Sequence, residues 1–181
     1  CQRGVTAGFE HYNDRLLRDG RFVLPNSAAH RQWNTATGKA RFLAQALRDD
    51  TPVQLARRRH GDAVLTLMTM RAHDQFNTTV YSSDDRYRGV AGDRRVVFLN
   101  AGDLASRGLA DGDRIDVETL VDDGHVRRVT GFTARAWDIP RGCCAAYFPE
   151  ASGLIAASVF SDGSRTPLYK EMPVRVQAHA A

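Results

Sequence analysis

The stretch that decides the fold is Ala63-Val-Leu-Thr-Leu-Met-Thr-Met-Arg-Ala-His-Asp-Gln-Phe-Asn-Thr-Thr-Val80. Its first half is a continuous run of apolar residues and Thr, rich in β-forming side chains, which is typical of a strand buried on both faces. Its second half becomes polar without a Gly or Pro. The stretch therefore predicts a buried strand that delivers polar side chains into a loop, either a binding loop or an ordinary surface loop.

The polar half of this stretch offers groups that suit a charged heterocyclic ligand. Arg71 carries a planar fork of donors that matches phosphate. Gln75 and Asn77 each carry a donor and an acceptor together, which suits the edge of a base or a pterin. The candidate binding residues of this stretch are Arg71, His73, Gln75, Asn77 and Thr78.

Length and composition indicate an ordinary globular protein. The chain has 181 residues, enough for one domain with a proper core and an appended segment. Its contents of 43% hydrophobic and 25% charged residues exclude a disordered chain. No apolar run approaches the length of a membrane span, so we expect no membrane partner. Because the chain begins with Cys1, we expect a fragment of a longer protein.

The charge pattern and the cysteines limit the possible ligands and the cellular compartment. The net charge is +4, with acidic residues interspersed among the arginines, and the one basic run, 57–60, is typical of a solvated face or a linker. No nucleic-acid motif accompanies that run, so we expect no nucleic-acid partner. Cys143 and Cys144 are too close to bridge each other, and no Cys-x-x-Cys spacing indicates zinc or an iron–sulfur cluster. An unbridged pair fits a reducing cytoplasm.

The rest of the chain reads as short strands separated by turns. The pattern of apolar residues predicts strands at 94–99, 114–120, 126–136, 143–148 and 173–176, the one at 126–136 with mixed alternation. Asn100 is expected to cap a short helix, with Asp103 as a capping-box analogue, although a carboxylate there also suits the donor edge of guanine. Tyr147 is either a core aromatic or a ligand contact. About six short strands with few helices predict a β-barrel, without fixing its topology.

Several motifs, taken in order, resemble the C-terminal cofactor domain of molybdopterin oxidoreductases, the dimethyl sulfoxide reductase superfamily. The formate-dehydrogenase-like alpha-subunit branch is the most similar. The resemblance covers about residues 34–177 and departs from the family pattern at Ala151, where an Asn is frequent. The motifs are Thr-x-x-Gly-Lys-x-x-Phe at 35–42, Thr69-Met-Arg71 with Gln75-Phe-Asn77-Thr78, Asp-Asp-Arg-Tyr-Arg-Gly at 84–89, Pro149-Glu150 after two aromatics, and Thr-Pro-x-Tyr-Lys at 166–170.

The resemblance implies a mainly β chain with short helices, folded as a double-psi β-barrel. Residues 1–60 would be the tail of the preceding domain and a linker, and residues 61–181 the molybdopterin dinucleotide-binding domain. The implied cofactor is molybdopterin guanine dinucleotide (bis-MGD), which carries molybdenum or tungsten in the full-length enzyme. The implied partners are the remaining domains of that enzyme.

The resemblance also implies which functions belong to this chain and which belong to the rest of the enzyme. This chain would bind and orient the cofactor, while the metal ligand and the catalytic residues would lie in the missing part, so the isolated fragment is expected to be inactive. The alternative is a stand-alone β-barrel that serves as an interaction or regulatory module without a cofactor. The expected cofactor contacts are Arg71, His73, Gln75, Asn77, Thr78, Asn100, Asp103, Tyr147, Glu150, Tyr169 and Lys170.

Overall fold

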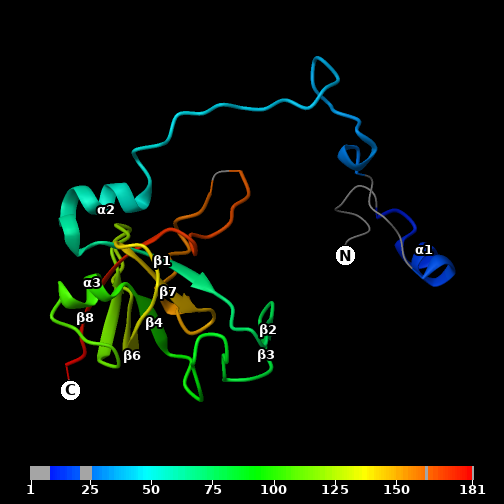
Figure 1. Cartoon of the computed structure of the whole chain (residues 1–181). Coiled ribbons are helices and arrows are strands. Elements are labelled where there is room, and N and C mark those ends of the chain that lie inside the picture. The colour runs from blue at the N-terminus through cyan, green and yellow to red at the C-terminus, as the bar shows by residue number, and fades with distance from the viewer. Residues whose placement is uncertain (1–8, 21–25, 162, 181) are drawn as a thin grey trace. The chain divides into compact units, whose positions relative to one another are not determined.

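A computed structural model describes residues 9–20, 26–161 and 163–180; Cys1, expected to be internal to a longer protein, lies outside them. The chain divides into two compact units, 1–47 and 48–181. The first contains α1 (Tyr12–Asp19) and the 3-10 turn η2 (Ala28–His30), followed by an extended segment with exposed apolar side chains (Figure 1). No helix in the described part of the chain is long and apolar enough to cross a membrane.

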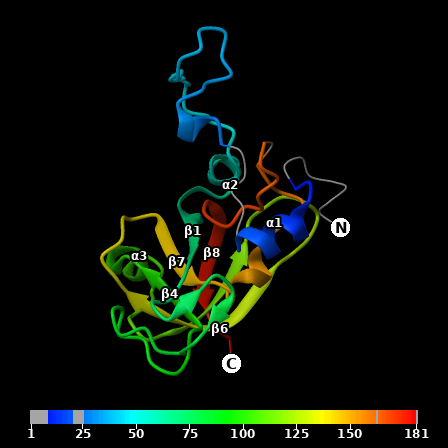
Figure 2. The same cartoon turned by 90° about the vertical axis from the view of Figure 1, so that its right-hand side faces the viewer.

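The second unit is a closed barrel of six strands in the order β1-β7-β4-β6-β5-β8, with β8 pairing back onto β1 (Figures 1 and 2). A separate two-stranded sheet, β2–β3, follows β1. This confirms the β-barrel that the strand pattern predicted and the double-psi topology, mainly β with short helices, that the family resemblance implied. The elements are α2 (Pro52–His60), η3 (Gly61–Ala63), β1 (Leu65–Met70), β2 (Gln75–Phe76), β3 (Thr79–Val80), β4 (Val96–Leu99), α3 (Ala101–Ala105), β5 (Arg114–Thr119), β6 (Arg128–Ala136), β7 (Cys143–Tyr147), η4 (Ser152–Leu154) and β8 (Met172–Ala178).

Strand register defines two ends of the barrel. β1 and β7 are parallel, paired from Thr66 with Cys143 to Met70 with Tyr147. β4 is antiparallel to β7, so it begins where β7 ends. We call the end where β1 and β7 finish the Met70 end, and the opposite end, where β4 finishes, the Leu99 end. β8 is antiparallel to β1 and therefore begins toward the Met70 end.

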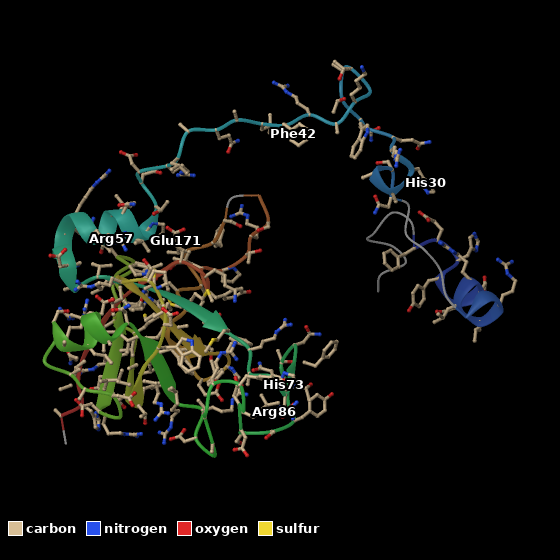
Figure 3. All side chains as sticks on the ribbon, in the orientation of Figure 1. His30, Phe42, Arg57, His73, Arg86 and Glu171 are labelled. Atoms are coloured by element: carbon tan, nitrogen blue, oxygen red, sulfur yellow. The ribbon has the colours of Figure 1, made fainter. Side chains whose placement is uncertain are left out.

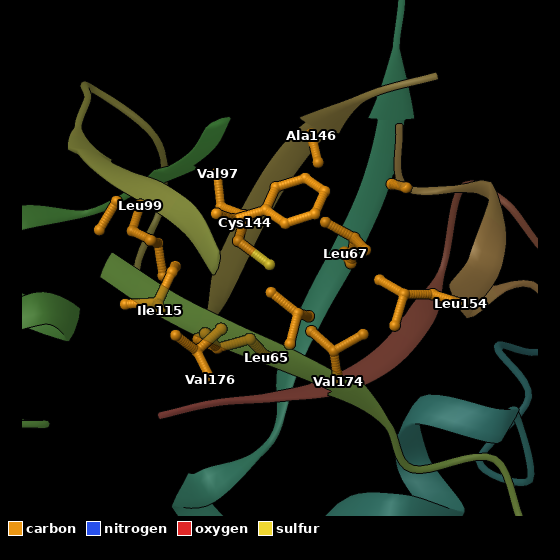
Figure 4. Packing of buried hydrophobic residues seen from close by; sticks show 14 of the residues in the cluster. Leu65, Leu67, Val97, Leu99, Ile115, Cys144, Ala146, Leu154, Val174 and Val176 are labelled. Carbon is orange, nitrogen blue, oxygen red and sulfur yellow. The ribbon is translucent and has the colours of Figure 1, made fainter. Parts of the chain in front are cut away.

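The barrel interior is filled by apolar side chains from all six strands, and the side chains drawn in Figure 4 point toward one another. In β1, Leu65 and Leu67 are fully buried, whereas Met68 is 45% exposed. The prediction that this strand is buried on both faces was therefore wrong. A barrel wall has one face toward the core, and along most of β1 the other face is not covered.

A second, smaller core lies against the other face of β4 and β7. It contains Val96, Phe98 and Tyr147 together with Ala72 and Val90 from the segment between β1 and β4. Phe98 packs edge-on against Tyr147, with ring centroids 5.7 Å apart. This core anchors the segment that follows β1 onto the barrel, at the same end as the polar residues after Met70.

Two neighbouring residues of β1 test the assignment of its faces. Leu67→Ala should lower the free energy of unfolding by about 2–5 kcal/mol, because it removes a fully buried side chain from the interior. Met68→Ala is the matched control and should change it by about 0.5 kcal/mol or less. Urea denaturation of the two variants measures both values, and equal losses would contradict the assignment.

Candidate functional site

A pocket of about 370 Å³ opens at the Met70 end of the barrel. It combines the end of β1, the β2–β3 turn, the residue after β7 and the residues before β8. We call it the Arg71 pocket; its lining is Thr69, Met70, Arg71, Asn77, Thr78, Phe148, Tyr169 and Lys170. Five of the residues expected from the sequence are thus brought together: Arg71, Asn77, Thr78, Tyr169 and Lys170.

The walls of the Arg71 pocket are joined by hydrogen bonds between segments far apart in sequence. The backbone N–H of Thr69 donates to the carbonyl of Tyr169 at 2.9 Å, and the Thr69 hydroxyl donates to the same oxygen at 3.2 Å. The Lys170 ammonium donates to the Thr69 carbonyl. The backbone bond extends the antiparallel pairing of β1 with β8 to a residue that precedes β8. Together the three bonds hold residues 169–170 beside the end of β1.

The charge of the Arg71 pocket is positive. Among the described residues that line it, Arg71 and Lys170 are cations and none is a carboxylate. Arg71 Nη2 donates to Oδ1 of Asn77 at 3.1 Å, and within the described residues its other N–H groups have no hydrogen-bond partner. Asn77 has a φ of 53°, in the left-handed region that Asn tolerates, and this turns the chain between β2 and β3. The pocket can therefore hold an anion beside amide and hydroxyl groups.

Arg94 is a functional candidate that sequence reasoning missed. It is 5% exposed, and its Nε donates to Glu150 at 2.6 Å. Its Nη2 donates to Gln75 at 2.7 Å and to the Phe148 carbonyl at 3.1 Å. The guanidinium also lies 5.0 Å from the ring centroid of Tyr147. One buried cation therefore ties the loop after β1 to the turn after β7, which are two walls of the Arg71 pocket.

Gln75, Tyr147 and Glu150, three of the expected cofactor contacts, are engaged with other protein groups. Gln75 is 8% exposed; it accepts from Arg94 and donates to the Asn77 carbonyl at 3.0 Å. Tyr147 is fully buried as a core aromatic. Glu150 forms the ion pair with Arg94. None of the three lines the Arg71 pocket; their hydrogen bonds and packing hold the segments next to it in place.

Asp85 fixes the loop 84–89. It is 1% exposed and accepts from the Tyr147 hydroxyl at 2.9 Å and from Arg88 at 2.6 Å. Burial favours a higher pKa for Asp85, but the hydrogen bonds from Arg88 and Tyr147 outweigh it and hold the pKa below its ordinary value. Burial, together with the Asp85 carboxylate, raises the pKa of Tyr147. The tyrosine therefore remains a hydrogen-bond donor at neutral pH.

His73 lies on the same loop system but outside the lining of the Arg71 pocket. Its ring packs edge-on against Tyr87 at 4.4 Å between centroids, and its Nε2 lies 3.5 Å from Arg86. Figure 3 shows His73 and Arg86 close together near the β2–β3 sheet. With 42% of its side chain exposed, His73 is available to a ligand that extends beyond the pocket.

Asn100 and Asp103 lie at the Leu99 end, away from the other expected contacts. Asn100 caps α3 as predicted, accepting from the N–H of Gly102 at 2.8 Å. The capping-box prediction for Asp103 was wrong. Its carboxylate accepts from the N–H of Gly142 at 2.6 Å and from Arg141 at 3.4 Å, because these groups approach from the turn before β7.

A comparison with known protein families shows to which family this chain belongs. The model of the family described as Molydopterin dinucleotide binding domain matches residues 65–173, from the first residue of β1 into β8. The chain belongs to this family. The described part of the chain contains no candidate metal site, that is, no group of three or more His, Cys, Asp or Glu side chains that could hold a metal ion.

Two curated relatives extend over nearly the whole chain. An uncharacterized oxidoreductase of Mycobacterium tuberculosis is 39% identical over 97% of this chain, and Protein YdeP of Escherichia coli is 34% identical over 96%. The chain spans 22% of the length of each. Among solved structures, acetylene hydratase from Pelobacter acetylenicus is 13% identical, with a TM-score of 0.49, covering 75% of this chain and 21% of that one.

Removing Arg94 should destabilise the protein through the charge it leaves behind. Arg94→Ala should lower the free energy of unfolding by about 3 kcal/mol, because Glu150 and Gln75 lose their buried partner. Adding Glu150→Gln should recover part of the loss, since it removes the unpaired charge. Arg95→Ala is the control: its pair with Asp93 is about half exposed, so it should cost less than about 1 kcal/mol. Denaturant unfolding measures all three, and equal losses for the two single variants would refute this role of Arg94.

Asp85 should contribute to acid sensitivity. Because its pKa is lower in the folded chain than in the unfolded chain, its ionised form stabilises the fold above the unfolded value. That contribution is lost as the pH falls below about 4 and through the folded-state value. The free energy of unfolding should therefore fall less steeply with acid in Asp85→Asn than in the parent chain. Unfolding titrations between neutral and acidic pH provide the measurement, with the exposed Asp138→Asn as control; parallel curves for Asp85→Asn and the parent would contradict the expectation.

Proposed function

We propose that this chain binds molybdopterin guanine dinucleotide in the Arg71 pocket and orients it as the C-terminal domain of a larger molybdenum or tungsten oxidoreductase. The observation that carries the proposal is the convergence of Arg71, Asn77, Thr78, Tyr169 and Lys170 on one pocket. Membership of the dinucleotide-binding family favours this function over a barrel module without a cofactor.

The chemistry of the lining fits an anionic dinucleotide. Arg71 offers a fork of N–H donors for a pyrophosphate, and Lys170 adds a compact positive charge. Asn77 supplies an amide at the edge of a heterocycle. Phe148 and Tyr169, whose ring centroids are 6.4 Å apart, provide apolar contact area.

The size of the pocket limits what this chain can hold. At about 370 Å³ it lies near the lower limit of ligand pockets, which is about 300 Å³. A pocket of this size suits one part of a dinucleotide. The remaining parts would contact His73 at its rim and the other domains of the parent enzyme, and residues 1–60 would form the tail of the preceding domain.

The cofactor, when bound, supplies the redox chemistry, and the residues of this chain hold it in place. The catalytic residues and the metal ligand are assigned to the missing domains, so the isolated chain should not oxidise formate. The loop 84–89 supports a formate-dehydrogenase-like parent, because its sequence resembles that branch. A cytoplasmic enzyme accords with the unbridged Cys143 and Cys144.

The proposal is tested in the full-length oxidoreductase. Arg71→Gln and Lys170→Gln should each weaken cofactor binding by about 1.5–3 kcal/mol, because each removes a charge-assisted contact to phosphate. Pterin fluorescence and metal content, measured after extended dilution, report how much cofactor each variant retains. Arg95→Gln, an exposed arginine outside the pocket, is the control. Retention equal to that of the control in both variants would overturn the assignment of the pocket.

A further inference from the structure

A second pocket, of about 540 Å³, lies at the Leu99 end of the barrel. It is formed by α2, the turn η3, α3 and the turn before β7. We call it the Asp103 pocket; its lining is Arg57, Gly61, Asp62, Val64, Asp103, Ser106, Arg107, Arg141 and Gly142. Figure 3 shows Arg57 on α2 at the opposite end of the barrel from His73 and Arg86.

Three guanidinium groups converge on the centre of this pocket. Gly142 donates its N–H to Asp103 at 2.6 Å, and the Asp103 carboxylate lies 3.4 Å from Arg141 Nε and 3.8 Å from Arg107 Nη1. Arg57 reaches the same place, because a Cβ built on Gly142 would lie 3.7 Å from its Nη2. All three cations are therefore next to the Gly142–Asp103 hydrogen bond.

One of the three arginines has an evident structural role. Arg107 donates to the carbonyls of Asp62 and Asp103, each at 3.0 Å, and its side chain is 15% exposed. It therefore fastens η3 to α3 and has little donor capacity left for a ligand. The fold at this end of the barrel does not depend in the same way on Arg57 and Arg141.

The lining of the Asp103 pocket carries more positive than negative charge, with three arginines against the two carboxylates Asp62 and Asp103. Within the described residues, Arg57 has a hydrogen bond only to the neutral hydroxyl of Thr66, at 3.2 Å, and no ion pair. The side chain of Arg141 is 68% exposed, and in the described part of the chain its hydrogen bond to Asp103 uses Nε, with none from the two terminal nitrogens. Asp103 is 5% exposed and already engaged by Gly142 and two arginines. The one buried carboxylate of the pocket is thus shared by Arg107 and Arg141, and Arg57 has no ion-pair partner among the described residues.

We propose that the Asp103 pocket binds the phosphate group of a small molecule. The guanidinium groups of Arg57 and of the exposed Arg141 side chain can hold a phosphate through several charge-assisted hydrogen bonds, and Arg107 adds positive charge to the pocket. The volume leaves room for the group that carries the phosphate. The parallel register of β1 and β7 puts this site at the other end of the barrel from the Arg71 pocket, so it is independent of the proposed cofactor site.

The experiment is a titration of the full 181-residue chain with inorganic phosphate at constant ionic strength, followed by ¹⁵N NMR of the arginine Nε groups. We expect saturable shifts at Arg57 and Arg141, fitted by a single dissociation constant. Arg57→Gln and Arg141→Gln should each weaken binding roughly tenfold, because each removes charge-assisted hydrogen bonds. Both residues are exposed, so neither change should unfold the chain.

Arg135→Gln is the matched control, since this arginine is also on the barrel but outside both pockets; it should leave the dissociation constant unchanged. Shifts confined to Arg71 and Lys170 would show that phosphate binds only at the other end and would overturn the proposal. Shifts that do not saturate, that chloride reproduces, or that survive both glutamine substitutions would overturn it as well. An absence of shifts would mean that the arginines serve another partner, such as a carboxylate of the parent protein.

Discussion

The parallel pairing of β1 with β7 is the constraint on which both pockets depend. Because the two strands run in the same direction, the residues that follow them, Arg71 and Phe148, meet at one end of the barrel. The residues that precede them, Val64 and Gly142, meet at the other. A slip of one residue would turn every side chain of β1 to the opposite face and remove Leu67 from the interior. Core packing thus fixes the positions of polar groups that contribute nothing to the core.

The two ends of the barrel use buried charge in different ways. At the Met70 end, Arg94 is a buried cation whose Nε and Nη2 donate to Glu150, Gln75 and the Phe148 carbonyl, whereas its buried Nη1 has no hydrogen-bond partner among the described residues. At the Leu99 end the buried group is an anion, Asp103, surrounded by cations in excess. In both cases one buried ion orders loops that apolar packing alone does not reach.

Much of the barrel was predictable, because its strands are apolar runs or alternate apolar with polar residues, and recognisable turns separate them. The predicted runs at 114–120 and 143–148 contain β5 and β7. The site was harder to predict, because a polar side chain in a loop gives the same signal whether it faces a ligand or a protein group. Gln75 accepts a hydrogen bond from Arg94, and Asp103 accepts one from Gly142, which is 39 residues away in the sequence. Arg94 itself was missed because a cation in the first position of a predicted strand is normally interpreted as a surface residue.

The hydrogen bonds between Thr69 and residues 169–170 also bear on how the protein is made. One wall of the Arg71 pocket is translated 100 residues after the wall it touches. Until β8 has left the ribosome and paired with β1, the end of β1 is an open edge and the pocket lacks Tyr169 and Lys170. A ligand that needs both walls can therefore be captured only after β8 has been synthesised, so closure of the barrel sets the earliest moment of loading.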